Sequence, residues 1–156
     1  MTKLYKQRMT AEVEDDMVVF LIGMRINKLW KIHKWLPVAL AMPKMIRELY
    51  QNPEMGFISQ ESWFGRTTLM VQYWKSFEHL EAYAKNRDGN HLPAWAAFNK
   101  KVANNGDVGI WHETYVVKAG NSECVYNNMP QFGLAKVGKH VAVTKHNHSA
   151  KNRLKK

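Results

Sequence analysis

One segment limits what this chain can fold into more than any other: residues 107–117, Asp-Val-Gly-Ile-Trp-His-Glu-Thr-Tyr-Val-Val. It is dense in β-branched and aromatic residues and lies between turn-like segments, so it predicts a β-strand. Alternate side chains of a strand point to opposite faces. Neither face is polar throughout, so we expect a central strand covered by helices on one side and by a second sheet on the other. The two faces are Val108, Ile110, His112, Thr114 and Val116, and Gly109, Trp111, Glu113, Tyr115 and Val117.

Two ionisable side chains interrupt this strand, one on each face. His112 belongs to the first face and Glu113 to the second. A buried imidazole or carboxylate must find a partner or shift its pKa. The strand is therefore the first place to look for a functional site.

Length and composition indicate one globular domain. The chain has 156 residues, of which 46% are hydrophobic, and this is enough for a substantial core. We expect an extended polar arm over residues 1–15 and a folded domain over residues 16–138. Residues 139–156 are expected to form a flexible basic tail.

The net charge of +10 is unevenly distributed. Residues 136–156 contain seven Lys or Arg and no Asp or Glu, so this segment supplies +7 and the remainder only +3. A short basic tail is typically a solvated segment, so we expect no nucleic-acid partner. The longest apolar runs, residues 17–24 and 36–42, are shorter than the ~18 residues that span a bilayer. The expectation is a cytoplasmic protein without a transmembrane segment.

The sequence lacks the common cofactor and metal motifs. Cys124 is the only cysteine, which excludes an internal disulfide and a thiolate metal cluster. It is more typical of a small buried hydrophobic residue than of a nucleophile. The absence of a glycine-rich nucleotide fingerprint and of Cys/His metal spacing argues against NAD, ATP and structural zinc.

Hydrophobic periodicity places the other elements. Residues 17–27 predict a strand with one wholly apolar face, and residues 57–64 and 67–74 predict a hairpin. Helices are expected to begin at Phe77, capped by Ser76, and near His91. With a first helix after residue 36, this is the split βαβ pattern of a ferredoxin-like fold. That fold is an α+β sandwich with a four-stranded antiparallel sheet and helices on one face.

The first helix carries an apolar stripe that is expected to face the core. It should start near Pro37 and be kinked or split at Pro43. The basic residues 28–34, which include Trp30, are expected to form a linker. A basic, tryptophan-bearing amphipathic stretch also suits a membrane surface, but core packing is the favoured interpretation. The stripe is Val38, Met42, Met45 and Leu49.

Several motifs, in the same order, resemble a known family. The chain is similar to the monooxygenase-like proteins of the dimeric α/β-barrel superfamily, a family named after a fungal enzyme associated with fumagillin biosynthesis. The motifs are Phe-Leu-Ile-Gly-Met-Arg-Ile-Asn at 20–27, Gln-Tyr-Trp-Lys-Ser-Phe-Glu-His-Leu at 72–80, Gly-Ile-Trp-His-Glu-Thr-Tyr at 109–115, Asn-Met-Pro at 128–130 and Phe-Gly-Leu at 132–134.

This resemblance implies a homodimer in which two ferredoxin-like sheets pack face to face into a barrel. Its implication for activity is broader. The superfamily includes cofactor-free monooxygenases that act on aromatic polyketides, haem enzymes such as aldoxime dehydratases, haem-degrading enzymes, and proteins with no known reaction. A shared fold does not choose among these activities.

The favoured hypothesis is a cofactor-independent monooxygenase that acts on a small apolar or aromatic substrate. Such a site needs an apolar cavity, a group that titrates near neutral pH, and hydrogen-bond donors for an oxyanion. His112 is the expected catalytic base, because the pKa of histidine lies nearest the working pH. Arg25, Tyr73, His91 and Trp95 are the expected substrate-binding residues.

Two alternatives remain open at this point. In the first, the protein binds haem, with His112 or His91 as the iron ligand in a tryptophan-rich pocket. In the second, the protein is a non-enzymatic binder of small molecules, and His112 only satisfies a hydrogen bond within the core.

Overall fold

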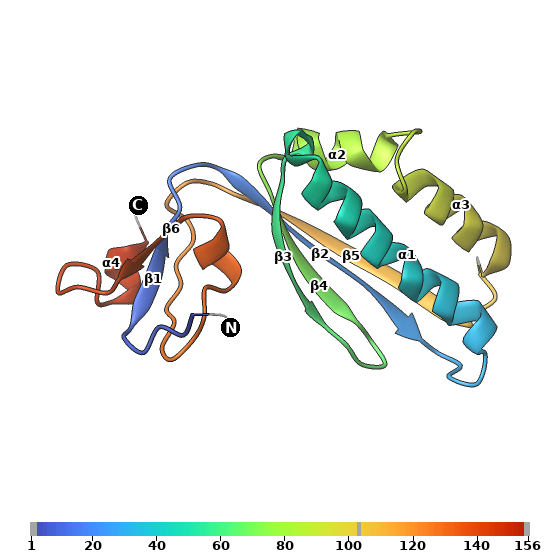
Figure 1. The fold of residues 1–156 in the computed structure, drawn as a ribbon, viewed down its shortest axis with the longest axis horizontal. Coiled ribbons are helices and arrows are strands. Elements are labelled where there is room, and N and C mark those ends of the chain that lie inside the picture. Colours follow the sequence, from blue (N-terminus) through green and yellow to red (C-terminus); the bar gives the residue numbers. More distant parts are fainter. Residues whose placement is uncertain (1–2, 103, 155–156) are drawn as a thin grey trace.

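A four-stranded antiparallel sheet with helices on one face forms the centre of the molecule (Figure 1). The computed structural model describes residues 3–102 and 104–154. The strand order is β3-β4-β2-β5, which is the order of a ferredoxin-like fold and confirms the predicted fold class. The strands are β2 (Met17–Ile26), β3 (Phe57–Trp63), β4 (Leu69–Trp74) and β5 (Val108–Val117).

Three helices cover one face of this sheet: α1 (Ile32–Gln51), α2 (Phe77–Lys85) and α3 (His91–Lys101). Ser76 caps α2 as predicted, because its side chain accepts a hydrogen bond from the amide of His79. The prediction for α1 was wrong about the start of the helix and about a split at Pro43. The helix begins at Ile32, within the expected linker, and it runs unbroken through Pro43. Pro43 has no amide hydrogen, so the carbonyl of Ala39, four residues earlier, loses its helical partner.

Two apolar clusters form the core between the sheet and the helices. The larger one is built around Val18, Leu49 and Trp74, each about 1% exposed. The smaller one joins Met24 and Ile26 of β2 to other side chains from α1, α3 and β5. Complete burial of one such large side chain contributes roughly 1.5–3 kcal/mol to stability. The predicted α1 stripe of Val38, Met42, Met45 and Leu49 packs in these clusters, as expected.

The strand at 107–117 is an edge strand, which corrects the expectation of a central one. β5 pairs with β2 alone, and β2 and β4 are the two inner strands. His112, Glu113, Thr114, Tyr115 and Val116 are all exposed in the chain, so the imidazole and the carboxylate are not buried. Alternation of side chains identifies a strand but not its neighbours, which is why the sequence alone placed β5 wrongly.

The two ends of the chain also differ from the expected arm and tail. Strand β1 (Met9–Glu12) pairs antiparallel with β6 (Lys139–Ala142), and these form a small second sheet. Met9 and Thr10 are buried, so this part of residues 1–15 is packed. A short helix, α4 (Ala150–Arg153), follows, and Arg153 forms an ion pair with Glu123 at 2.8 Å. Two short 3-10 helices complete the fold: η1 (Pro53–Met55) and η2 (Gly133–Lys136).

A close backbone approach explains one glycine in the middle of β2. Gly23 lies opposite Trp111 in the β2–β5 ladder. A Cβ atom on Gly23 would lie 2.0 Å from the carbonyl oxygen of Thr68 and 2.7 Å from Nε1 of Trp111. The first of these atoms belongs to the backbone and cannot rotate away. A side chain at position 23 would therefore force the sheet apart.

We predict that Gly23→Ala lowers the free energy of unfolding by about 1–3 kcal/mol, the usual cost of overpacking a well-packed region. Urea denaturation followed by tryptophan fluorescence measures this change. Gly65→Ala is the matched control, because the nearest atom to its Cβ would be 3.7 Å away. Equal unfolding midpoints for the two variants would contradict the steric explanation.

Candidate functional site

The sheet divides the five predicted site residues between its two faces. In β2, the side chains of Val18, Met24 and Ile26 enter the core clusters under the helices. Ile22 shares their face by alternation, and His112 is its direct partner in β5. His112 therefore lies on the helix-covered face. Arg25 in β2 and Tyr73 in β4 belong to the opposite face, which we call the open face.

His112 lies where the helix-covered face reaches the sheet edge. Its ring centroid is 5.6 Å from that of Phe20, which packs against the larger core cluster. The side chain is exposed, and within the described residues its ring nitrogens form no hydrogen bond. The imidazole thus has one side on an aromatic surface and both nitrogens available to a ligand.

His91 and Trp95 come from α3, on the same side of the sheet as His112. Nδ1 of His91 is 3.0 Å from the carbonyl oxygen of Ala84, so this histidine ties the start of α3 to α2. Trp95 stacks on Phe98, with ring centroids 5.6 Å apart, and its own ring is about half exposed. His91 has a structural hydrogen bond, whereas Trp95 presents an aromatic surface to a ligand.

On the open face, Arg25 and Tyr73 have separate surroundings. Arg25 is exposed and donates a hydrogen bond from Nη1 to Oγ1 of Thr67 at 2.7 Å. Tyr73 is buried, and its burial raises the pKa of the phenol, as do the nearby negative charges of Glu61 and, to a smaller extent, Cys124. These two residues do not share a cavity with His112 within one chain. Within one chain the five residues therefore do not lie on one face of the sheet.

Tyr73 is buried because the η2 segment folds over part of the open face. Gly133 donates its backbone amide to Oε1 of Glu61 at 3.0 Å, and Nζ of Lys136 pairs with the same oxygen at 2.7 Å. The Phe132 ring packs edge-to-face on Trp63 of β3. The motif at 128–134, which contributed to the family resemblance, thus has a structural role: it anchors the segment that follows β5 to β3.

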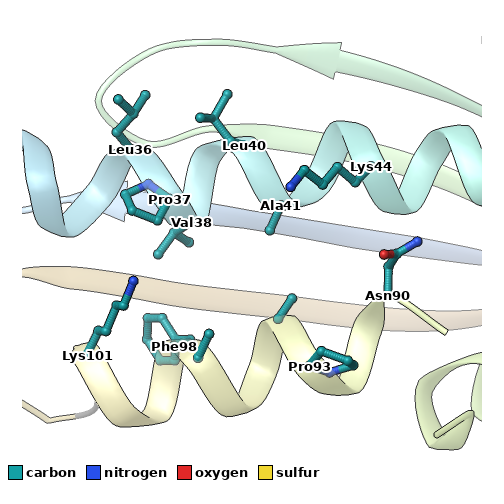
Figure 2. Close-up of a pocket in the computed structure, with 12 residues that line it drawn as sticks. Leu36, Pro37, Val38, Leu40, Ala41, Lys44, Asn90, Pro93, Phe98 and Lys101 are labelled. Atoms are coloured by element: carbon teal, nitrogen blue, oxygen red, sulfur yellow. The ribbon is translucent and has the colours of Figure 1, made fainter. Parts of the chain in front are cut away.

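A groove with a largely apolar lining lies between α1 and α3 (Figure 2). Its volume is about 460 Å³. None of the five predicted site residues lines it, so sequence reasoning missed it. A second apolar stripe on α1, which contains Leu36 and Leu40, could have indicated this groove from the sequence. The lining residues are Leu36, Pro37, Val38, Leu40, Ala41, Lys44, Asn90, Pro93, Ala94, Ala97, Phe98 and Lys101.

The sheet order, and the helices on a single face, define an α+β protein of the ferredoxin-like class. Residues 17–134 match the family described as monooxygenase af470-like, and the chain belongs to that family. This confirms the resemblance that the motifs indicated. No helix in the described residues is long and apolar enough to cross a membrane.

The chain covers less than half of the length of each of three similar proteins. Monooxygenase af470 of Aspergillus fumigatus is 32% identical over 95 residues, which is 57% of this chain and 32% of that protein. The chain thus spans about a third of the length of this relative. Aldoxime dehydratase OxdRE, solved in complex with butyraldoxime, superposes with a TM-score of 0.69 at 18% identity, covering 88% of this chain and 41% of that one. A second aldoxime dehydratase gives a TM-score of 0.64 at 18% identity over 92% and 45% of the two chains. At this identity the likeness concerns the fold.

Neither of the two expected haem ligands, His112 and His91, lines the α1–α3 groove. An iron ligand is normally a His, Cys, Met or Tyr side chain, and none of these lines the α1–α3 groove. His112 lies outside that groove on the sheet edge, and His91 contacts the carbonyl of Ala84 through Nδ1, which leaves Nε2 as the nitrogen that could bind iron.

Because burial disfavours the charged phenolate, we predict that Tyr73 ionises above its ordinary pKa of 10.0. A raised pKa in the folded state stabilises the protein below the pKa of the unfolded chain, and this contribution is lost as the pH rises above 10.0. Tyr73→Phe should therefore show a shallower loss of stability than the wild type in this range. Thermal melting between pH 8 and pH 11 makes the comparison, and parallel profiles would contradict it.

Proposed function

We propose that this protein is an oxidoreductase of the monooxygenase type that needs no bound cofactor and acts on a small apolar or aromatic substrate beside His112. The observation that carries the proposal is the position of His112. Its imidazole lies against the Phe20 ring with both nitrogens free within the described chain. Membership of a monooxygenase-like family supports the reaction class. Trp95 supplies a second aromatic surface on the same side of the sheet.

His112 acts as the general base in this proposal. A substrate with a phenol or enol lies on the Phe20 ring and transfers a proton to an imidazole nitrogen. Histidine suits this step because its ordinary pKa is close to neutral pH. The resulting electron-rich carbanion reduces molecular oxygen, and a CH2 carbon conjugated with the phenol or enol becomes a carbonyl. The substrate thereby supplies all four electrons: one oxygen atom enters it, and the other leaves as water with the two hydrogens lost from that carbon. Arg25 and Tyr73 have no part in this step, because they lie on the other face of the sheet.

We further propose that two copies of the chain pack through their open faces. On β5 this face carries Trp111 and the half-exposed Tyr115, and on β2 it carries Val19 and Leu21. Bulky groups of this kind, gathered on one face, are typical of an interface. A face-to-face dimer leaves the helix-covered side, with His112, accessible to substrate.

We predict that His112→Asn reduces turnover by at least ~10²-fold, the usual effect of removing a general base. Its free energy of unfolding should change by less than ~0.5 kcal/mol, because the side chain is exposed. Oxygen consumption with a panel of hydroxylated polycyclic aromatic compounds provides the assay, and chemical denaturation provides the stability.

Glu113→Gln is the matched control for His112→Asn. Glu113 is the adjacent residue on the same strand, also exposed, and its side chain points to the open face. This variant should keep its activity. If both variants are folded and consume oxygen at the wild-type rate, His112 is not the base and the protein is better explained as a small-molecule binder.

We predict that Tyr115→Glu converts the dimer to a monomer, because the change places a buried charge on each copy at the interface. Light scattering at micromolar concentration measures the mass of the wild type and of the variant. Val116→Glu, on the helix-covered face of the same strand, is the control and should remain dimeric. A monomeric wild type would contradict the proposed assembly.

A further inference from the structure

Helix α1 carries two apolar stripes, and only one of them packs in the core. Met42, Met45 and Leu49 pack under the helix in the larger core cluster. Ile32, Leu36 and Leu40 are spaced four residues apart on a different side of the helix. These three side chains are 54%, 39% and 55% exposed. A stripe of large aliphatic side chains in water is costly unless something else covers it.

Other exposed apolar side chains lie next to this stripe in the chain, and the stripe borders the groove. Leu29 and Trp30, just before α1, are 55% and 75% exposed. Leu36 and Leu40 also form the outer rim of the α1–α3 groove, whose floor is lined by small and apolar side chains (Figure 2). We call this combined surface the α1 face. It consists of Leu29, Trp30, Ile32, Leu36, Leu40 and the groove.

The charges around the α1 face are almost all positive. Helices α1 and α3 together carry five cations and one acid. The acid, Glu48, is engaged, since it accepts hydrogen bonds from Tyr83 and from the amide of Asn90. The five cations form no ion pair within the described residues, and the Lys44 and Lys101 side chains extend beside the groove (Figure 2). They are Lys34, Lys44, Arg47, Lys100 and Lys101.

We propose that the α1 face docks this protein on an anionic lipid membrane, with α1 lying in the plane of the surface. Exposed Ile and Leu side chains beside a tryptophan, flanked by lysines, are the composition of helices that bind at the interface between headgroups and acyl chains. The apolar stripe would enter the acyl boundary, and the flanking lysines would contact anionic headgroups. Membrane binding therefore explains both the exposed apolar stripe and the unpaired cations.

Charge argues against a second copy of the chain as the occupant. Two α1 faces in contact would bring ten cations together, five from each copy, with no free acid among them. Like charges placed opposite one another oppose association. The basic tail is a separate feature, because α4 and the C-terminal end lie at the opposite end of the molecule from the start of α1 (Figure 1).

Co-sedimentation of the full chain with vesicles tests this proposal. We expect binding to vesicles of phosphatidylcholine with about 30% phosphatidylserine and at least tenfold weaker binding to phosphatidylcholine alone, because headgroup charge supplies most of the attraction. The double variant Leu36→Ser with Leu40→Ser should bind anionic vesicles at least tenfold more weakly. The double variant Lys44→Gln with Lys101→Gln should lose roughly 25-fold at low salt, since each lysine contributes about fivefold.

Two control variants separate the α1 face from other exposed groups. Phe64→Ser removes an 89% exposed aromatic side chain at the β3–β4 turn, and Lys145→Gln with Lys151→Gln removes two exposed cations near the C-terminus. Both should bind anionic vesicles within about twofold of the wild type. All positions are exposed or at the rim of the groove, so circular dichroism melting should be unchanged and loss of binding cannot be attributed to unfolding.

Two outcomes would overturn the proposal. A wild-type chain that does not sediment with anionic vesicles at low salt would show that lipid is not the occupant and would favour an acidic protein partner. Binding that is lost in the Lys145/Lys151 variant but retained in the Leu36/Leu40 variant would show that the basic tail, and not the α1 face, binds the membrane.

Discussion

The double pairing of β2 is the constraint on which the rest of the structure depends. All ten residues of β2 pair with β5 on one side, and five of them pair with β4 on the other. Because alternate side chains point to opposite faces, this ladder decides at once which residues of three strands face the helices. Val18 and Met24 enter the core, and their partner strands must follow the same alternation. The separation of His112 from Arg25 and Tyr73 is a direct consequence.

The sequence predicted local structure well and neighbours poorly. The strand at 17–27, the hairpin, the Ser76 cap and the start of α3 at His91 each depend on residues close in the chain, and all were found where expected. The edge position of β5 depends on which strand lies beside it, which alternation cannot show. The β1–β6 pair joins residues about 130 positions apart through two short, partly polar strands, so neither strand has a detectable pattern of its own.

The grouping of the site residues could not be predicted from the sequence for a related reason. Arg25, Tyr73 and His112 are each reasonable site residues by type, yet their grouping required knowledge of the face that each one occupies. The face that a side chain occupies depends on the register of strand pairing. A shift of one residue would move every side chain of the strand to the opposite face. The groove was missed because α1 was given only one apolar stripe. Leu36 and Leu40 were counted as part of an apolar run rather than as a second stripe on the helix.

Helix α3 connects the two functional surfaces proposed for this protein. Phe98 lines the groove on one side and packs against the smaller core cluster, while Trp95 stacks on its ring. His91, one turn earlier, fixes the start of the helix to α2 through Ala84. The Trp95–Phe98 stack therefore lies between the groove and the aromatic surface proposed for the substrate. The β2 ladder, by contrast, positions His112 and Phe20 without any residue that lines the groove.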